Sequence, residues 1–149
     1  LRVSEVCDLT MPDLDMQARK LVVHDGKGGK DRTLWFSERV RNALAEWLEV
    51  RPEPAEDGQK WVFPTRTGRR TSRQSIHRTI KTYAEKAELE EADQVSPHTL
   101  RHTFATDLYR QTGDIRTVQR ALGHADISTT MIYTHIVDEE LQEAMQALE

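Results

Sequence analysis

Apolar residues recur at helical spacing along most of this sequence. The stripe formed by Val40, Ala43, Leu44, Trp47 and Leu48 is typical of an amphipathic helix, and Ser37 is its expected N-cap. Two similar stripes predict helices that begin at Ser72 and at Ser96-Pro97. Their inward-facing residues are expected to be Ile76, Ile80, Tyr83, Ala84 and Ala87 in the first helix and Leu100, Phe104 and Leu108 in the second.

Shorter helices are predicted on either side of these. Residues 2–9 have the pattern of a helix end, and a helix over 114–122 is ended by Gly123. Two more helices are expected over 127–134 and 138–148. The last of them places Leu141, Ala144, Met145 and Leu148 on one face and acidic residues on the other.

Strand-like segments are confined to the first half of the chain. Residues 20–24 and 32–36 are short, partly β-branched runs that flank a glycine-rich connection, so they predict a β-hairpin. Residues 13–15 are a candidate third strand, and 61–65 a short extended piece. The expected fold class is therefore mainly α with a small antiparallel β-sheet (α+β).

Length and composition limit the function classes. The chain has 149 residues, enough for one domain over 1–149, and no apolar run long enough to span a bilayer. Its one cysteine, Cys7, excludes an internal disulfide and a multi-cysteine metal site. These features predict a cytoplasmic domain without a membrane partner.

Charge is unevenly distributed. The net charge is −4, which argues against a general nucleic-acid binder, but residues 66–86 hold seven bases and one acid. Such a segment suits a phosphate-lined surface, although charged helix faces are also commonly just solvated. The candidate DNA-binding residues are Arg66, Arg69, Arg70, Arg73, Arg78 and Lys81.

The segment His98-Thr-Leu-Arg-His102 places two histidines on one helix face. A zinc pair is disfavoured because Arg101 lies on nearly the same face and no glutamate base intervenes. Two interpretations stay open. One is a histidine that caps or packs near a helix start, and the other is recognition of an anion by His98 and Arg101 together.

Three other features carry candidate chemistry. Lys27 lies on the glycine-rich turn, which is no P-loop because a strand follows it; the lysine is either solvated or an ammonium carried into a site. Arg2 and Glu5 are one helical turn apart. Either Glu5 orients the Arg2 side chain, or the two form an ordinary surface ion pair. Tyr133, after Leu122-Gly-His124, would by itself be a half-buried core tyrosine.

Taken in order, these motifs resemble the catalytic domain of a tyrosine recombinase, the phage integrase and Xer-type family. They are Arg2-x-Ser-Glu, Gly26-Lys-Gly-x-Lys, His98-x-Leu-Arg-His, Leu122-Gly-His and Ile132-Tyr-x-His. The resemblance runs from Arg2 to His135. It implies that the earlier part of the catalytic domain and a separate amino-terminal DNA-clamping domain are missing from this sequence.

The resemblance implies a role for each matching residue. Arg2 and Arg101 would grip the scissile phosphate, with His98 and His124 as accessory histidines. Tyr133 would be the nucleophile and Lys27 the general acid on the leaving 5′-oxygen. Lys30 and Arg32 match positions that are often basic, without a catalytic role. No metal and no cofactor are implied.

Phosphodiester chemistry favours this residue set independently. Attack builds negative charge on the non-bridging oxygens, which two planar guanidiniums and histidine donors can neutralise. A tyrosine with an ordinary pKa of about 10 needs a positive surround or a base such as His98. The phosphotyrosyl bond conserves the backbone energy, so rejoining needs no ATP.

The resemblance therefore implies a site-specific recombinase that forms a 3′-phosphotyrosyl intermediate on a double-stranded DNA site. It further implies a homotetramer on DNA, associated with the nucleoid, in which the last helix contacts a neighbouring subunit; folding of that helix onto its own core is the alternative. Two other functions stay open: a type IB topoisomerase and a non-catalytic DNA-binding module of the same fold.

Overall fold

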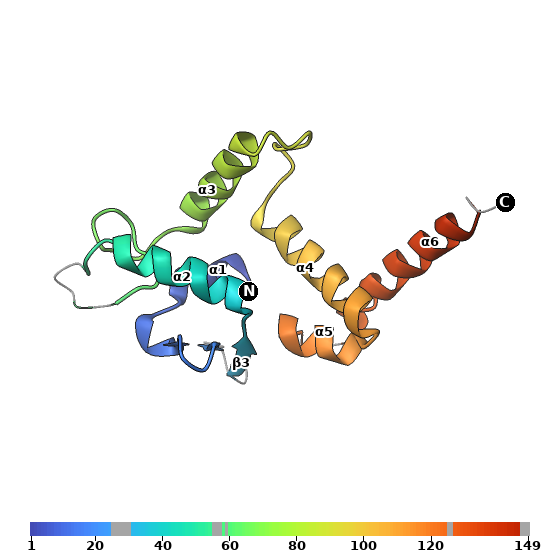
Figure 1. The fold of residues 1–149 in the computed structure, drawn as a ribbon, viewed down its shortest axis with the longest axis horizontal. Coiled ribbons are helices and arrows are strands. Elements are labelled where there is room, and N and C mark those ends of the chain that lie inside the picture. The colour runs from blue at the N-terminus through green and yellow to red at the C-terminus, as the bar shows by residue number, and fades with distance from the viewer. Residues whose placement is uncertain (25–30, 55–57, 59, 125–126, 147–149) are drawn as a thin grey trace. The chain divides into compact units, whose positions relative to one another are not determined.

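A computed structural model describes residues 1–24, 31–54, 58, 60–124 and 127–146. It contains two compact units, an amino-terminal unit (Leu1–Pro97) and a carboxyl-terminal unit (His98–Glu149) (Figure 1). Helices dominate, and three short strands form one antiparallel sheet, so the expected fold class is confirmed. Among the described residues, no helix is long and apolar enough to cross a membrane.

The amino-terminal unit contains the sheet. Its strands lie in the order β1-β2-β3, with Leu14 opposite Leu21 and Val23 opposite Arg32. This confirms the predicted strand pairing, whereas the turn that carries Lys27 (residues 25–30) lies outside the described residues. The elements of this unit are α1 (Val3–Asp8), a 3-10 turn η1 (Met11–Asp13), β1 (Leu14–Asp15), β2 (Lys20–Val23), β3 (Arg32–Trp35), α2 (Glu38–Val50) and α3 (Arg73–Lys86).

The core of this unit lies on one face of β2, which packs against Leu9 at the end of α1 and against Val62. Leu9, Leu21, Val23 and Val62 are buried there, so β2 shows the alternation expected of a half-buried strand. The Trp47 indole N–H donates to the Val62 carbonyl at 2.8 Å, which fixes α2 against the segment behind the sheet. Trp47 is half-buried, and its hydrogen bond lets the ring contribute apolar contact without leaving its donor unsatisfied.

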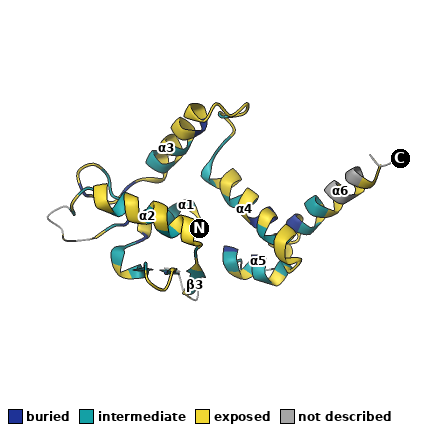
Figure 2. Ribbon diagram, viewed as in Figure 1, coloured by how far each residue is buried: buried dark blue, intermediate teal, exposed yellow. Residues whose placement is uncertain are grey.

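The predicted helix starts are confirmed, and two of the predicted stripes need correction. The hydroxyls of Ser37 and Ser72 accept the backbone N–H groups of Val40 and Ser75, as N-caps do. The stripes are wrong at their margins, where the side chains are exposed (Figure 2). In α3 the Tyr83 ring is exposed, and the Lys86 ammonium lies over it, 5.7 Å from its centroid. The exposed positions are Val40 and Ala43 in α2 and Tyr83 and Ala87 at the end of α3.

The carboxyl-terminal unit is helical and includes α4 (Pro97–Thr112), α5 (Ile115–Leu122), a 3-10 turn η2 (Ile127–Thr129) and α6 (Ile132–Gln146). Ala105, Val118, Leu122 and Tyr133 form its buried cluster. The stripe predicted for α4 is wrong at Leu100 and Phe104, each 50% exposed. The small side chain of Ala105 instead allows Val118 and Leu122 to pack close to α4, and Leu108 lies against the same cluster as predicted.

The end of the chain also differs from the prediction. Instead of helices over 127–134 and 138–148, the structure has η2 followed by one continuous helix, α6. No glycine or proline interrupts residues 132–146, so nothing ends the helix where a break was expected. Tyr133 therefore lies in the first turn of α6, whose later turns extend away from α4 and α5 (Figure 1).

A polar cluster ties the beginning of the sheet to the base of the hairpin. The two ring nitrogens of His24 contact the carboxylates of Asp13 at 2.8 Å and Asp31 at 2.7 Å. The hydrogen bonds from these carboxylates raise the pKa of His24 above its ordinary value. Burial tends to raise the pKa of Asp13, but bonds from Thr10 and His24 outweigh it and lower the pKa. Both shifts favour the charged pair.

The His24 cluster predicts a pH dependence of stability. Because its folded pKa lies above the unfolded value of 6.5, the contribution of His24 is complete below that pH and is lost as the pH rises through the folded pKa. The free energy of unfolding of the parent should exceed that of His24→Gln most at about pH 5–6. Denaturant titrations up to about pH 9 measure this gap; a gap that is constant or widens with pH contradicts the interpretation.

Candidate active site

Arg101, on α4, is held against the end of α5. Its Nη2 donates to the Leu122 carbonyl at 2.7 Å and lies 3.3 Å from Nε2 of His124. The Leu122 carbonyl belongs to the last turn of α5, where carbonyls lack helical partners and the helix dipole is negative. The end of α5 therefore fixes the guanidinium of this half-buried arginine.

His124 is placed by the way α5 ends. Gly123 adopts a left-handed conformation with φ of 68°, which glycine adopts without steric cost, and its N–H donates back to the helix. The His124 N–H donates to the Gln119 carbonyl and the Gln119 side-chain amide donates to the His124 carbonyl, both at 3.2 Å. Nδ1 of the ring lies 3.0 Å from the Thr130 hydroxyl.

Tyr133 lies in the buried cluster of the same unit, with 6% of its surface exposed. Its ring is 5.0 Å from the His102 ring, inclined at 51°. Burial raises the pKa of the phenol above its ordinary value, against the opposing effect of the Arg101 charge. Tyr133 is therefore protonated at neutral pH, in a position that a positive group already influences.

The two histidines of the HTLRH segment have different surroundings. His98 lies in the first turn of α4 and is exposed, one turn before Arg101. His102 is partly buried and packs on Tyr133. Within the described part of the chain, no three histidine, cysteine or acidic side chains gather as a metal site. The joint recognition of an anion by His98 and Arg101 stays a prediction.

Arg2 belongs to the amino-terminal unit, where Glu5 orients it. One Glu5 oxygen accepts from Arg2 Nη1 at 3.0 Å, and the other accepts from the Arg2 backbone N–H at 2.6 Å. Both oxygens also receive a two-pronged contact from Arg32 on β3, at 3.0 and 2.8 Å. Burial tends to raise the pKa of Glu5, but the Arg32 and Arg2 hydrogen bonds outweigh it and lower the pKa. Of the two interpretations, the oriented arginine is the one that these contacts support.

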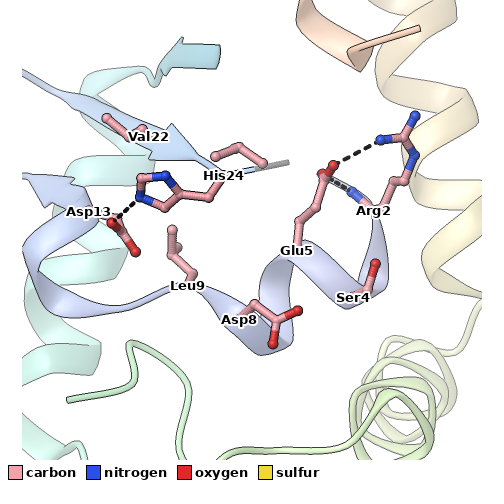
Figure 3. A pocket seen from close by; sticks show the side chains of 9 residues that line it. Arg2, Ser4, Glu5, Asp8, Leu9, Asp13, Val22 and His24 are labelled. Atoms are coloured by element: carbon pink, nitrogen blue, oxygen red, sulfur yellow. Dashed lines mark hydrogen bonds and ion pairs between the residues drawn. The ribbon is translucent and has the colours of Figure 1, made fainter. Parts of the chain in front are cut away.

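Next to Arg2 lies a small pocket of about 200 Å³ (Figure 3). Glu5, Asp8 and Asp13 all line it, so its wall is rich in carboxylates. Such a lining disfavours a phosphate in the pocket itself. The assignment of Arg2 to phosphate binding stays a prediction.

The basic residues of the 66–86 segment lie in a turn and along α3. Arg66 and Arg69 are in the turn closed by the Gly68 N–H to the Thr65 carbonyl, and both are exposed. Arg73, Arg78 and Lys81 are exposed along α3. Arg70 differs from the others because it forms an ion pair with Asp8. The charge-based assignment of these residues to DNA binding stays a prediction.

Several contacts of the candidate site residues were not predicted. Thr130 and Gln119 hold His124, His102 packs on Tyr133, and Arg32 shares Glu5 with Arg2. His102 is part of the quoted motif and was a candidate for packing. The Arg32–Glu5 pair joins residues 27 positions apart, a distance over which no local spacing gives a signal.

Comparison with known proteins identifies relatives of this chain. The sequence pattern of the phage integrase family matches residues 1–140. "Tyrosine recombinase XerD" of Brucella suis biovar 1 is 45% identical over 144 residues, which is 95% of this chain and 46% of that protein. "Tyrosine recombinase XerC" of Corynebacterium glutamicum is 40% identical, covering 97% of this chain and 45% of the relative. The chain thus spans a little under half the length of these relatives.

Solved structures show the same fold. The XerA recombinase structure superposes with a TM-score of 0.84 at 37% identity, over 99% of this chain and 53% of that one. The XerH site-specific recombinase bound to palindromic difH substrate, a post-cleavage complex, gives a TM-score of 0.78 at 30% identity, over 97% and 41% of the two chains.

Replacement of Glu5 by glutamine tests the arginine cluster. Glu5 and Arg32 side chains are only 11% and 14% exposed, so the change removes the negative charge between the arginines and turns one acceptor oxygen into an NH2 group that cannot accept from them. We expect Glu5→Gln to lower the free energy of unfolding by about 1–3 kcal/mol. The control Asp107→Asn removes an exposed pair with Arg110 and should change it by less than about 1 kcal/mol. Equal effects in denaturant titrations would show that Glu5 is an ordinary surface acid.

Proposed function

The chain belongs to the phage integrase family, and we propose that it is the catalytic part of a site-specific DNA recombinase that cuts and rejoins strands through Tyr133. One observation carries the proposal: Arg101 on α4, His124 in the turn after α5 and Tyr133 on α6 gather within one compact unit. Family likeness to recombinases solved with their DNA substrates supports double-stranded DNA as the partner.

In the proposed reaction, the Tyr133 hydroxyl oxygen attacks the scissile phosphorus. A new Oη–P bond forms while the bond to the 5′-oxygen breaks, which leaves a 3′-phosphotyrosyl link and a free 5′-hydroxyl. Charge that develops on the non-bridging oxygens is neutralised by the guanidiniums of Arg2 and Arg101. Arg101 suits this task because its Nη2 is held by the Leu122 carbonyl, so little reorganisation is needed.

The two protons of the reaction need separate partners. The phenol of Tyr133 is protonated at rest because burial raises its pKa, so it needs a base, for which His98 is the candidate. The departing 5′-oxygen takes a proton from Lys27 in this scheme. His124 adds a ring nitrogen beside Arg101. Rejoining reverses the steps when another 5′-hydroxyl attacks the phosphotyrosyl bond, so the cycle draws on neither ATP nor a metal.

DNA contacts beyond the scissile phosphate are assigned to Arg66, Arg69, Arg73, Arg78 and Lys81, which are exposed on one turn and one helix. Such residues bind phosphates without reading sequence, so they set affinity and its salt dependence. Arg70, the sixth residue predicted to contact DNA, is expected to contribute less because it is ion-paired with Asp8.

We further propose that the enzyme works as a homotetramer on DNA, in the cytoplasm and associated with the nucleoid. Strand exchange joins two duplexes, so each must be held by its own pair of subunits. The later turns of α6 are suited to a neighbour because they extend away from the buried cluster and expose Met145, which is 60% accessible (Figure 1). Ile136, nearer the start of α6, packs on the chain's own core.

The nucleophile assignment predicts a covalent adduct. Full-length protein that contains this chain, incubated with nicked duplexes from its own genomic flanks, should form an SDS-resistant protein–DNA species. Tyr133→Phe should abolish it, because the attacking oxygen is removed. Tyr109→Phe is the matched control: it removes a hydroxyl beside the same buried cluster and should leave the adduct intact. The readout is a denaturing gel of labelled DNA.

The same experiment separates the alternatives. An adduct that persists in Tyr133→Phe contradicts the nucleophile assignment, and clear DNA binding without any adduct favours a non-catalytic module. Relaxation of a supercoiled plasmid that lacks a specific site favours a type IB topoisomerase.

Removal of the last helical turns tests the assembly surface. Deletion from Asp138 onward leaves Ile136 in place, so the carboxyl-terminal unit should keep its fold and its thermal transition. Assembly on DNA, measured by native gel mobility, should fall from higher-order complexes to singly bound protein. Unfolding of the deletion variant in circular dichroism would instead place these turns on the chain's own core.

A further inference from the structure

Thr130 is a fully buried polar residue that contacts two members of the candidate site. It lies between η2 and α6, with 0% of its surface exposed. Its hydroxyl is 3.0 Å from Nδ1 of His124, and its carbonyl accepts the backbone N–H of Tyr133 at 3.1 Å. One threonine thus connects the accessory histidine to the first turn of the helix that carries the nucleophile.

The contacts of the second ring nitrogen define the tautomer of His124. Nε2 lies 3.3 Å from Arg101 Nη2, and a guanidinium nitrogen can only donate. Nη2 carries two N–H groups, so it can serve the Leu122 carbonyl at 2.7 Å and Nε2 at the same time. Nε2 therefore presents its lone pair, and the proton of the neutral ring is on Nδ1, from which it is donated to Thr130 Oγ1.

Backbone hydrogen bonds do not fix the orientation of the His124 ring. Bonds with Gln119 fix both the N–H and the carbonyl of His124, but they do not restrict rotation of the imidazole about its side-chain bonds. The Thr130 hydroxyl is the described side-chain contact on the Nδ1 side. It accepts the proton that the Arg101 contact at Nε2 leaves on Nδ1, and it limits rotation of the ring. Because Thr130 is fully buried, a hydroxyl without a hydrogen-bond partner would lower the free energy of unfolding. The Thr130 hydroxyl and the His124 ring therefore each stabilise the position of the other.

We propose that Thr130 is a positioning residue: its hydroxyl keeps the proton of His124 on Nδ1 and directs Nε2 toward Arg101 and the anion that Arg101 binds. The Nδ1–H bond to Thr130 is common to the neutral ring and to the imidazolium. Nε2 alone then changes from an acceptor of Arg101 to a donor when it gains a proton beside a phosphate. The catalytic part of this inference rests on the proposed function; the tautomer does not.

The tautomer is tested by nuclear magnetic resonance of the chain with ¹⁵N-labelled histidine. Long-range ¹H–¹⁵N correlations should show His124 with a protonated Nδ1 and an unprotonated Nε2. Thr130→Val keeps the shape and removes the hydroxyl, so the ring should shift toward the Nε2–H form or an average of the two. Thr130→Ser keeps the hydroxyl and should restore the parent pattern.

A matched control separates this role from the loss of any buried hydroxyl. Thr106 is 6% exposed and its hydroxyl bonds only the His102 carbonyl of its own helix among the contacts described for that group. Thr106→Val should leave the His124 spectrum unchanged. A parent ring protonated on Nε2, or a Thr130→Val ring identical to the parent, overturns the proposal, and the first of these needs no variant to fold.

Adduct formation then tests the consequence for catalysis. Thr130→Val should slow it by about 10- to 100-fold, the range found when a group that orients a ligating histidine is removed. DNA affinity should stay at the parent value, and Thr130→Ser should recover most of the rate. A slower Thr130→Val with an unchanged ring spectrum contradicts the mechanism. If the parent itself forms no adduct, the proposed function fails while the spectrum still decides the role of Thr130.

Discussion

The position of one guanidinium governs the arrangement of the carboxyl-terminal unit. Arg101 is half-buried, and the last turn of α5 offers it a carbonyl while His124 offers it a ring nitrogen. Both acceptors follow from the way α5 ends at Gly123, and Tyr133 is close enough for the charge of Arg101 to act on its phenol. The three short segments that carry Arg101, His124 and Tyr133 therefore lie around one positive charge. Such a centre is suited to a polyanion.

The amino-terminal unit uses a different solution for its arginine. Arg2 is oriented by a carboxylate that also binds Arg32, so two cations share one acid and the group keeps a net positive charge. Arg101, in contrast, is positioned by a backbone carbonyl and a histidine ring nitrogen. Both arrangements preserve a cation while fixing its geometry, which is what neutralising charge in a transition state requires.

The helix ends that depend only on neighbouring residues were predicted correctly from the sequence. Ser37, Ser72, Asp114 and Gly123 marked helix ends correctly, because a cap depends on the few residues around it. The packed face of α4 was not predictable in this way. The large apolar residues Leu100 and Phe104 suggested that their side is buried, but they are half-exposed, and the small Ala105 lies in the buried cluster instead. The helix break expected between residues 134 and 138 was wrong, because no glycine or proline interrupts that stretch and α6 continues through it.

The candidate site was predictable as a set of residues but not as a network. Motif order pointed to Arg101, His124 and Tyr133, whereas Thr130 looked like one of several threonines, and its partner became visible only when the turn folded back on His124. The most direct measurement of the central claim is mass spectrometry of the protein–DNA adduct after protease and nuclease digestion. The account predicts a nucleotide joined through its 3′-phosphate to the peptide that contains Tyr133. A nucleotide on any other residue, or a linkage through the 5′ end, would contradict it.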